Sequence, residues 1–426
     1  MTTTLSNPAT SQTDETTATV TTTPGAATAR RSTTVVGDVT PRVDFYGVDD
    51  LLTADEIGVR DRVRAFVDAD VTPIIAPYWE RAEFPMQLVP KLRALNIAGG
   101  SLRGYGCPGM SAVADGLIGV ELGRGDGSVE VFFGVHSALA MTSIALCGNE
   151  EQKSRWLPLM ARMDILGAFG LTEPFNGSDA GHLRTTARRD GDHYILDGAK
   201  RWIGNGHLAD VVVIWARDEA DGKVGAFLVE KGTPGYTAEV MAGKSALRAL
   251  GNADITLSGV RVPADHKLAN GRDFRDTGRV LTATRYGVAC GALGHAMACY
   301  EAALDYTTKR EQFGKPIAGH QLVQAKLVWM LTEITAMQLL VWRLGKLLDE
   351  GRMTAEQASL AKLNNAAKAR KIAADARDIM GGNGILLDNI VARHQADMEA
   401  VFSYEGTDHV QTLIIGRAIT GTQAFV

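Results

Sequence analysis

The stretch LVWMLTEITAMQLLVWRLGKLL, residues 327–348, decides the architecture of the C-terminal part of the chain. Its large apolar side chains recur every three or four residues over roughly six helical turns. They are Leu327, Met330, Ile334, Met337, Val341, Leu344 and Leu348. A long helix with one apolar stripe is typical of a helix bundle, where neighbouring helices bury that stripe. This spacing therefore predicts a long bundle helix.

Helical signals continue on both sides of this stretch. Helix returns at about Asp276, and the sequence TAEQ at 354–357 is a capping box that begins a further helix. That helix is predicted to end at the glycines of GGNG, 381–384. We therefore expect residues 276–426 to form a C-terminal four-helix bundle.

Residues 166–275 show a different period. Short runs of large apolar residues are separated by Gly, Asp, Asn and Pro at intervals that suit hairpins. The runs are YIL at 194–196, VVVIW at 211–215, AFLV at 226–229 and ITL at 255–257. This pattern predicts a compact antiparallel β domain in the middle of the chain.

Helical spacing also covers residues 43–165, where TADE at 53–56 is a capping box followed by an apolar helix face. The expected fold class is α+β and mainly α: an N-terminal helical domain, a middle antiparallel β domain and a C-terminal helical bundle. Residues 1–42 are rich in Thr, Ser and Ala, which cannot bury enough apolar surface to become ordered. A disordered tail is the favoured interpretation, and a transit peptide, suggested by Arg30 and Arg31, is the alternative.

The bulk composition narrows the function classes. The 426 residues carry a net charge of −5 and the pI is about 6.0, so neither nucleic acid nor an anionic membrane surface is an expected partner. Four cysteines without a C-x-x-C pair favour a reduced, cytoplasmic protein with no disulfide framework and no metal site. Charged residues interrupt the apolar runs, so no membrane span is predicted.

The residues that could carry chemistry lie in five short strings. They are FGLTEPFNGSD at 169–179, KRWIGN at 200–205, REQFGKP at 310–316, GGNG at 381–384 and YEGT at 404–407. A carboxylate such as Glu405, displayed on a glycine turn after helices, can be aimed into a buried cleft as a base. Each string also has a purely structural interpretation: a polar turn, a core tryptophan, a helix-end arginine, helix-ending glycines and a solvated glutamate.

In their order and context, the strings resemble the acyl-CoA dehydrogenase family, closest to its branch of glutaryl-CoA dehydrogenases and plant-type short-chain acyl-CoA oxidases. The resemblance runs from about residue 46 to the end and includes GRAITG at 416–421. It implies a three-domain homotetramer with FAD bound between the β domain and the bundle. It also implies that an acyl-CoA loses two hydrogens to become a trans-2-enoyl-CoA, with electrons passing to electron-transfer flavoprotein.

The resemblance also assigns roles to residues. Glu405 is the implied base for the α-proton, while a hydride leaves the β-carbon for flavin N5. The implied cofactor-binding residues are Leu171, Thr172, Ser178, Trp202, Ile203, Arg310, Phe313, Gly381, Gly382 and Thr407. Among these, Arg310 and Phe313 are implied to reach FAD across a subunit interface. The implied substrate-binding residues are Arg285, Glu130 and Gly406.

Three positions depart from the family pattern. Glu130 and Val131 stand where glutaryl-CoA dehydrogenases have Arg-Ser, so a distal carboxylate would be repelled unless Glu130 points elsewhere. Gly204 stands where many dehydrogenases have Thr and short-chain oxidases have Gly; it would either leave room for oxygen or reflect ancestry alone. His409 replaces an Asp, which puts one flavin hydrogen bond in doubt.

The favoured interpretation is a dehydrogenase of a short or medium, non-dicarboxylic acyl-CoA. An acyl-CoA oxidase that makes hydrogen peroxide is the first alternative, and oxygen consumption distinguishes it. A decarboxylating glutaryl-CoA dehydrogenase is the second, and release of carbon dioxide distinguishes it. A non-catalytic assembly protein that keeps the fold is the third, and failure to hold FAD would favour it.

Overall fold

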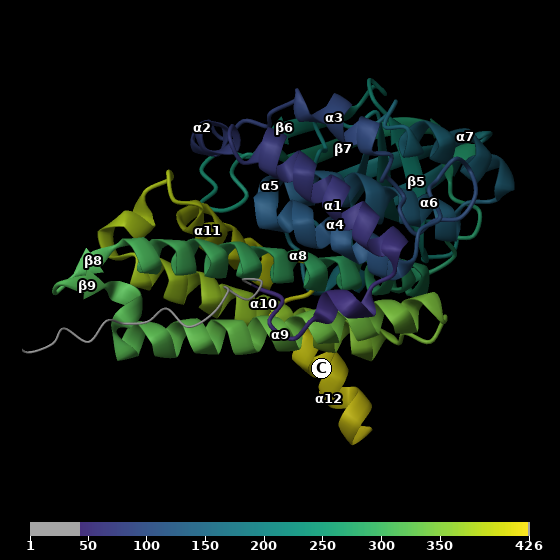
Figure 1. Ribbon diagram of the computed structural model, residues 1–426. Helices are drawn as coiled ribbons and strands as arrows, with labels where there is room; N and C mark the ends of the chain where they lie inside the picture. Colours follow the sequence, from purple (N-terminus) through teal and green to yellow (C-terminus); the bar gives the residue numbers. More distant parts are fainter. Residues whose placement is uncertain (1–42, 425–426) are drawn as a thin grey trace, which may run out of the picture. The chain divides into compact units, whose positions relative to one another are not determined.

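A computed structural model describes residues 43–424 (Figure 1). The predicted tail, 1–42, lies outside the described residues. The described part runs from helices, through a sheet, back to helices, in the predicted order. This order confirms the α+β, mainly α fold class.

Seven α-helices of the described chain precede the sheet. They are α1 (Ala54–Phe66), α2 (Ile75–Arg81), α3 (Leu88–Leu95), α4 (Ala112–Gly125), α5 (Gly127–Gly134), α6 (Met141–Cys147) and α7 (Glu150–Ala161). The predicted capping box begins α1. The Thr53 hydroxyl accepts a hydrogen bond from the N–H of Glu56 at 3.3 Å, and the Thr53 N–H donates to the Glu56 carboxylate at 2.8 Å. These bonds satisfy two amides that the fold would otherwise leave unpaired.

The middle of the chain forms one seven-stranded sheet. Its strands are β1 (Gly167–Gly170), β2 (Thr186–Asp190), β3 (His193–Gly204), β4 (Val211–Asp218), β5 (Val224–Glu230), β6 (Tyr236–Val240) and β7 (Asn252–Pro263). The strand order is β1-β4-β2-β3-β7-β6, and β5 pairs with β4.

The sheet is antiparallel except along one edge of β4, where β1 and β2 run parallel to it. This corrects the expectation of a purely antiparallel domain. β1 pairs with residues 211–214 and β2 with residues 217–218, so the two strands follow one another along the same edge. They can do so because the chain leaves the sheet between them, over residues 171–185, and then returns. That loop carries most of the string at 169–179, and strands anchor both its ends.

The C-terminal part consists of five α-helices and a small hairpin within the described residues. They are α8 (Phe274–Lys309), β8 (Glu311–Gln312), β9 (Lys315–Pro316), α9 (Gln321–Asp349), α10 (Ala355–Ile379), α11 (Ile390–Ser403) and α12 (Asp408–Thr420). The predicted stripe lies on α9, and all its members except Leu348 are buried. The predicted capping box begins α10, where Thr354 accepts from the N–H of Gln357 at 3.3 Å.

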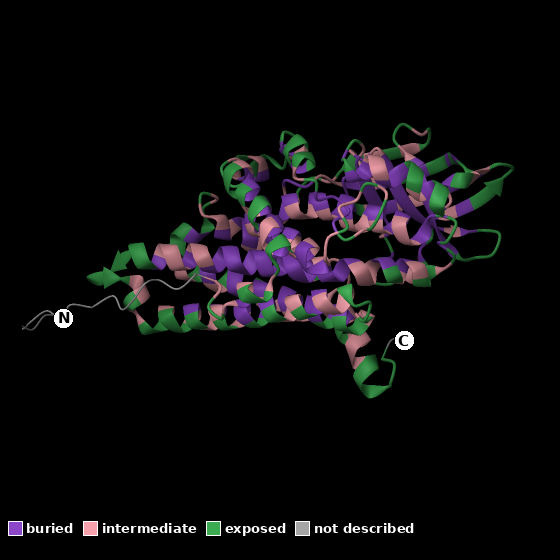
Figure 2. Cartoon of the chain, turned by 45° about the vertical axis from the view of Figure 1, so that its right-hand side comes forward, coloured by how far each residue is buried: buried purple, intermediate pink, exposed green. Residues whose placement is uncertain are grey.

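The helix α8 is the central element of this bundle. It packs against α4, α9, α10 and α11. Its residues 284–300 are buried with the exception of Gly287, in keeping with the run of buried residues that Figure 2 shows through the middle of the chain. A helix in this position can place side chains from one face into a site shared by several elements.

Two helical stretches, Gly127–Cys147 and Gln321–Asp349, have the length and composition of a membrane span. In the first, 56% of the apolar window is buried inside the protein, and in the second 33% is buried. Core helices of soluble proteins share these features, so composition alone assigns no span. The expectation that no segment spans a membrane stays a prediction.

Candidate active site

The predicted base, Glu405, lies on a short turn between two helices. Helix α11 ends at Ser403, and α12 begins at Asp408. Thr407 caps α12, because its hydroxyl accepts a hydrogen bond from the N–H of Val410 at 3.3 Å. Glu405 itself has a φ of 49°, in the left-handed region that a residue with a Cβ adopts only at a cost. The turn directs the Glu405 carboxylate towards α8.

Two buried side chains hold this turn through hydrogen bonds to its backbone carbonyls. The Lys362 ammonium on α10 donates hydrogen bonds to the carbonyls of Phe402 at 3.0 Å and Gly406 at 2.8 Å. The Gln411 amide on α12 donates to the carbonyls of Glu405 at 2.8 Å and Gly406 at 3.2 Å. The carbonyls around the base are therefore satisfied, and the strained backbone of Glu405 is fixed by its surroundings.

Sequence analysis did not find Lys362 or Gln411. A weak signal was present for Lys362, which lies four residues from both Ala358 and Ala366 on the buried face of α10. A lysine on such a face must find oxygen partners, because an unpaired buried charge is costly. The partners themselves are some forty residues away in the sequence, and no local pattern points to them.

The surroundings of the Glu405 carboxylate include effects that raise its pKa and effects that lower it. Its Oε2 accepts a hydrogen bond from the Thr284 hydroxyl at 2.8 Å. Burial raises the pKa of Glu405, while Thr284, the Arg285 charge and the Lys362 charge lower it. The balance leaves the pKa of Glu405 above its ordinary value. A carboxylate with a raised pKa is a stronger base when it is ionised.

A second carboxyl group, that of Glu130 on α5, lies in the electrostatic range of Glu405. Burial, and secondly the charge of Glu405, raise the pKa of Glu130 to about 8. The Oε2 atom of Glu130 is buried and has no hydrogen-bond partner among the described residues. Arg285, on α8, is also buried, and its Nη1 reaches the Ser359 hydroxyl at 3.5 Å. The structure thus brings Glu130, Arg285 and Glu405 into one site.

The loop at 171–185 is tied to the sheet by a buried ion pair. The Lys200 ammonium on β3 lies 2.9 Å from Glu173 and also donates to the carbonyl of Leu171 at 3.1 Å. Glu173 in turn accepts from the N–H of Thr185 at 2.9 Å, where β2 approaches. The carbonyl of Thr172 accepts from the N–H of Arg201 at 2.8 Å. Glu173 and Lys200 stand inside the predicted strings, but sequence analysis gave them no role.

Trp202 stands on a bulge of β3. The pairing of β3 with β7 shifts between Lys200 and Ile203, and Trp202 has a φ of 66°. A bulge redirects a side chain relative to the strand. The Trp202 side chain is 53% exposed, whereas Ile203 and Leu171 are buried. Ser178 lies exposed on the adjoining loop.

The remaining predicted cofactor residues form a separate group at the end of the bundle that carries the β8–β9 hairpin (Figure 1). Phe313, at the hairpin tip, is 94% exposed. Arg310 caps the end of α8, where its N–H donates to the carbonyl of Tyr306 at 2.8 Å. The exposed pair Gly381 and Gly382 precedes Asn383, which donates to the Tyr306 hydroxyl at 2.8 Å. Within the described residues, no hydrogen bond or ring contact joins this group to Trp202.

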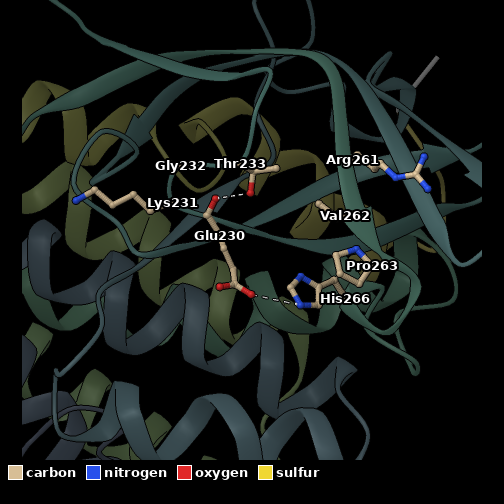
Figure 3. Close-up of a pocket in the computed structure, with 8 residues that line it drawn as sticks. All are labelled: Glu230, Lys231, Gly232, Thr233, Arg261, Val262, Pro263 and His266. Atoms are coloured by element: carbon tan, nitrogen blue, oxygen red, sulfur yellow. Dashed lines mark hydrogen bonds and ion pairs between the residues drawn. The ribbon is translucent and has the colours of Figure 1, made fainter.

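Two surface cavities of the described residues lie away from the predicted site, and no predicted site residue lines either of them. The first, of about 280 Å³, is lined by Glu230, Lys231, Gly232, Thr233, Arg261, Val262, Pro263 and His266 (Figure 3). Some of its polar groups pair with one another: His266 lies 3.5 Å from the Glu230 carboxylate, and the Thr233 hydroxyl donates to the Glu230 carbonyl at 2.7 Å. The second, of about 390 Å³, lies beside α7 and the end of β7.

The residues on β3 and its loop fit a flavin. An exposed indole on a strained bulge offers a face for a planar ring, and the anchored loop offers the Thr172 and Ser178 hydroxyls. Gly204 has a packing reason, since a Cβ there would lie 2.9 Å from Cγ2 of Val135. The space beside Gly204 is thus occupied by the Val135 side chain, which gives this glycine a packing role. His409 is exposed in the first turn of α12.

Comparisons with known proteins agree with this arrangement. Family models match in chain order: the acyl-CoA dehydrogenase N-terminal domain at residues 53–164, the middle domain at 168–260 and the C-terminal domain at 274–420. An acyl-CoA dehydrogenase of Bacillus subtilis is 36% identical over 87% of this chain and 99% of its own length. The mitochondrial short-chain specific acyl-CoA dehydrogenase of Bos taurus is 33% identical over 84% of this chain and 88% of its own.

Solved structures give the same result. A glutaryl-CoA dehydrogenase of Mycobacterium smegmatis aligns with a TM-score of 0.88 and 44% identity, covering 90% of this chain and 99% of that one. A second structure, of a glutaryl-CoA dehydrogenase of the same organism in complex with FADH2, aligns with a TM-score of 0.88 and 41% identity over the same shares. The chain therefore belongs to the acyl-CoA dehydrogenase family of FAD-dependent oxidoreductases.

Proposed function

We propose that this protein converts a short or medium acyl-CoA without a distal carboxylate to the trans-2-enoyl-CoA, with Glu405 as the base that removes the α-proton. One observation carries the proposal. Glu405 is a carboxylate held on a left-handed turn by Lys362 and Gln411, hydrogen-bonded to Thr284, with a raised pKa. A solvated glutamate would have none of these features.

The turn also offers a donor for the developing negative charge. The N–H of Glu405 donates no hydrogen bond within the described residues. A thioester oxygen placed against it would gain charge as the α-proton leaves, and a fixed backbone donor stabilises such charge. The Thr284 hydroxyl holds the carboxylate in place until the proton arrives. FAD, when bound beside Trp202, supplies the acceptor for the hydride of the β-carbon.

Glu130 supports the proposed substrate class. A distal carboxylate beside Glu130 would add a negative charge to the site that already holds the Glu405 carboxylate, and no cation acts at Glu130 to offset that charge. This argues against glutaryl-CoA, although the M. smegmatis proteins of similar structure are glutaryl-CoA dehydrogenases by name. The bovine relative is named for short-chain substrates.

The same proposal includes a cytoplasmic homotetramer that passes electrons to electron-transfer flavoprotein. Exposed Phe313 and Arg310 support the oligomer, because Phe313 is 94% exposed and its ring contact within the described residues is an edge-on one with His320, at 6.0 Å between the ring centroids. Apolar residues of α9 are exposed as well, Leu322 at 83% and Val328 at 65%. The packing of Gly204 against Val135 gives this glycine a role that does not require an oxidase.

The test is anaerobic reduction of the purified yellow protein by a panel of acyl-CoAs, glutaryl-CoA included, followed by admission of air. Rapid bleaching by a monocarboxylic acyl-CoA and slow recovery in air are expected. Fast recovery with peroxide would make the protein an oxidase, and carbon dioxide from glutaryl-CoA would make it decarboxylating. If no thioester bleaches a protein that holds FAD, the proposed function is wrong.

A further inference from the structure

One face of α8 connects the two carboxyl groups of the site. Thr284, Gly287 and Gly291 occupy positions i, i+3 and i+7 and so share this face. Thr284 holds the Glu405 carboxylate at 2.8 Å, and a Cβ on Gly291 would lie 2.7 Å from Oε1 of Glu130. Seven residues of helix span about 10 Å, so the two carboxyl groups mark the ends of a segment of that length.

The middle of this segment is open. Gly287 is the one residue of 284–300 in the described helix that is not buried, and a Cβ added to it would meet no atom within 4 Å. Gly134 shows the same openness on α5, one helical turn after Glu130. A Cβ on either glycine would meet no atom within 4 Å, and the two glycines lie on the helix that carries Glu130 and on the helix that Glu130 contacts, so they leave space where the rest of residues 284–300 is buried.

The carboxyl group of Glu130, at the far end of this segment, can accept a further hydrogen-bond partner. Because Gly291 lacks a Cβ, the Glu130 carboxyl can lie against the backbone of α8. Its Oε2 is buried and unpaired among the described residues. An unpaired buried polar atom is costly, and a bound group that pairs with it recovers that cost.

We propose that Glu130 recognises the far end of the acyl chain through a hydrogen bond to an uncharged polar group, such as a hydroxyl or a carbonyl. The inference rests on the proposed function, since it takes Glu405 as the near end of the chain. The acyl group would run along α8 from Glu405, past Gly287, to Glu130.

The electrostatics explain why the polar group is uncharged. Burial and the charge of Glu405 hold the pKa of Glu130 near 8, and no cation opposes these two effects. Glu130 is therefore mostly a neutral carboxylic acid at pH 7, which can donate as well as accept a hydrogen bond. The cations of the site, Arg285 and Lys362, act on Glu405 instead.

The test compares matched pairs of acyl-CoAs, equal in chain length, with and without a terminal hydroxyl. The kcat/KM of flavin reduction is measured for wild type, Glu130→Gln, Glu130→Leu and the control Glu239→Leu, which alters an exposed glutamate of β6. We expect wild type, the control and Glu130→Gln to prefer the hydroxylated member. In Glu130→Leu the preference should fall roughly 10- to 100-fold, because the hydroxyl loses its partner.

Two outcomes would overturn the proposal. The first is equal kcat/KM for both members of each pair in wild type, which would mean that Glu130 does not recognise a polar group on the acyl chain. The second is an unchanged preference in Glu130→Leu. Both differ from failure of the proposed function, in which no member of the panel would bleach the flavin of any variant.

Discussion

The two parts of the predicted site differ in how complete they are within one chain. Around Glu405, α8, α10 and α12 supply the hydroxyl, the ammonium and the amide that hold the base. Around Arg310 and Phe313 there is only a small hairpin whose side chains are exposed. The side chains that hold the base all come from one chain, whereas the exposed hairpin residues are predicted to contact FAD of a neighbouring subunit. This contrast predicts that the two regions will respond differently to substitution.

The largest effect is expected at the base itself. Glu405→Gln keeps the shape of the side chain and its contact with Thr284, but the amide cannot take a proton. Turnover should fall roughly 10⁴-fold while FAD content and acyl-CoA binding stay near those of wild type. Single-turnover flavin reduction and a flavin spectrum measure the two properties separately. Near-normal turnover would remove Glu405 from the mechanism.

The second effect tests whether the turn is held as described. Lys362→Met removes both hydrogen bonds to the carbonyls of Phe402 and Gly406, and kcat should fall roughly 10- to 100-fold. The Lys362 charge lowers the pKa of Glu405, so its loss should raise that pKa and move the acidic limb of the kcat profile to higher pH. Lys362→Arg keeps the charge and should restore the limb. A lower kcat with an unshifted limb would leave Lys362 a structural role only.

Much of the fold could be predicted because its signals are local. The stripe on α9 and the capping boxes at Thr53 and Thr354 involve residues three or four apart, and the structure has them as predicted. The parallel edge of β4 could not be predicted, since alternation along a strand does not encode the direction of its neighbour.

The site divides in the same way. Glu405 and Trp202 stood out because each lies in a short string with turn residues around it. Lys362 and Gln411 did not, because their partners are backbone carbonyls that only folding brings near. Glu173 and Lys200 were quoted within strings, but nothing in those strings shows that the two side chains meet at 2.9 Å.

The third effect tests the other side of the contrast. Arg310→Ala removes an exposed guanidinium with no described role in its own chain, so the fold and the Glu405 turn should be untouched. If Arg310 contacts the FAD of a neighbouring subunit, the Kd for FAD should rise roughly tenfold. This is the change expected from the loss of one charge-assisted hydrogen bond. Lys309→Ala, its exposed neighbour, is the matched control. Equal FAD occupancy in the two variants, measured by absorbance after dilution, would contradict the predicted role of Arg310.

The smallest effect is expected at Thr284, and it sharpens the description of the base. Thr284→Val keeps the volume but removes the hydroxyl that donates to Oε2 of Glu405 at 2.8 Å. That bond stabilises the ionised form, so its loss should raise the pKa of Glu405 further and reduce the ionised fraction at pH values below the new pKa. We expect kcat to fall several-fold at low pH, roughly the effect of one hydrogen bond of about 1 kcal/mol, and to approach the wild-type value at high pH. A deficit of equal size across the pH range would instead mean that Thr284 only positions the carboxylate.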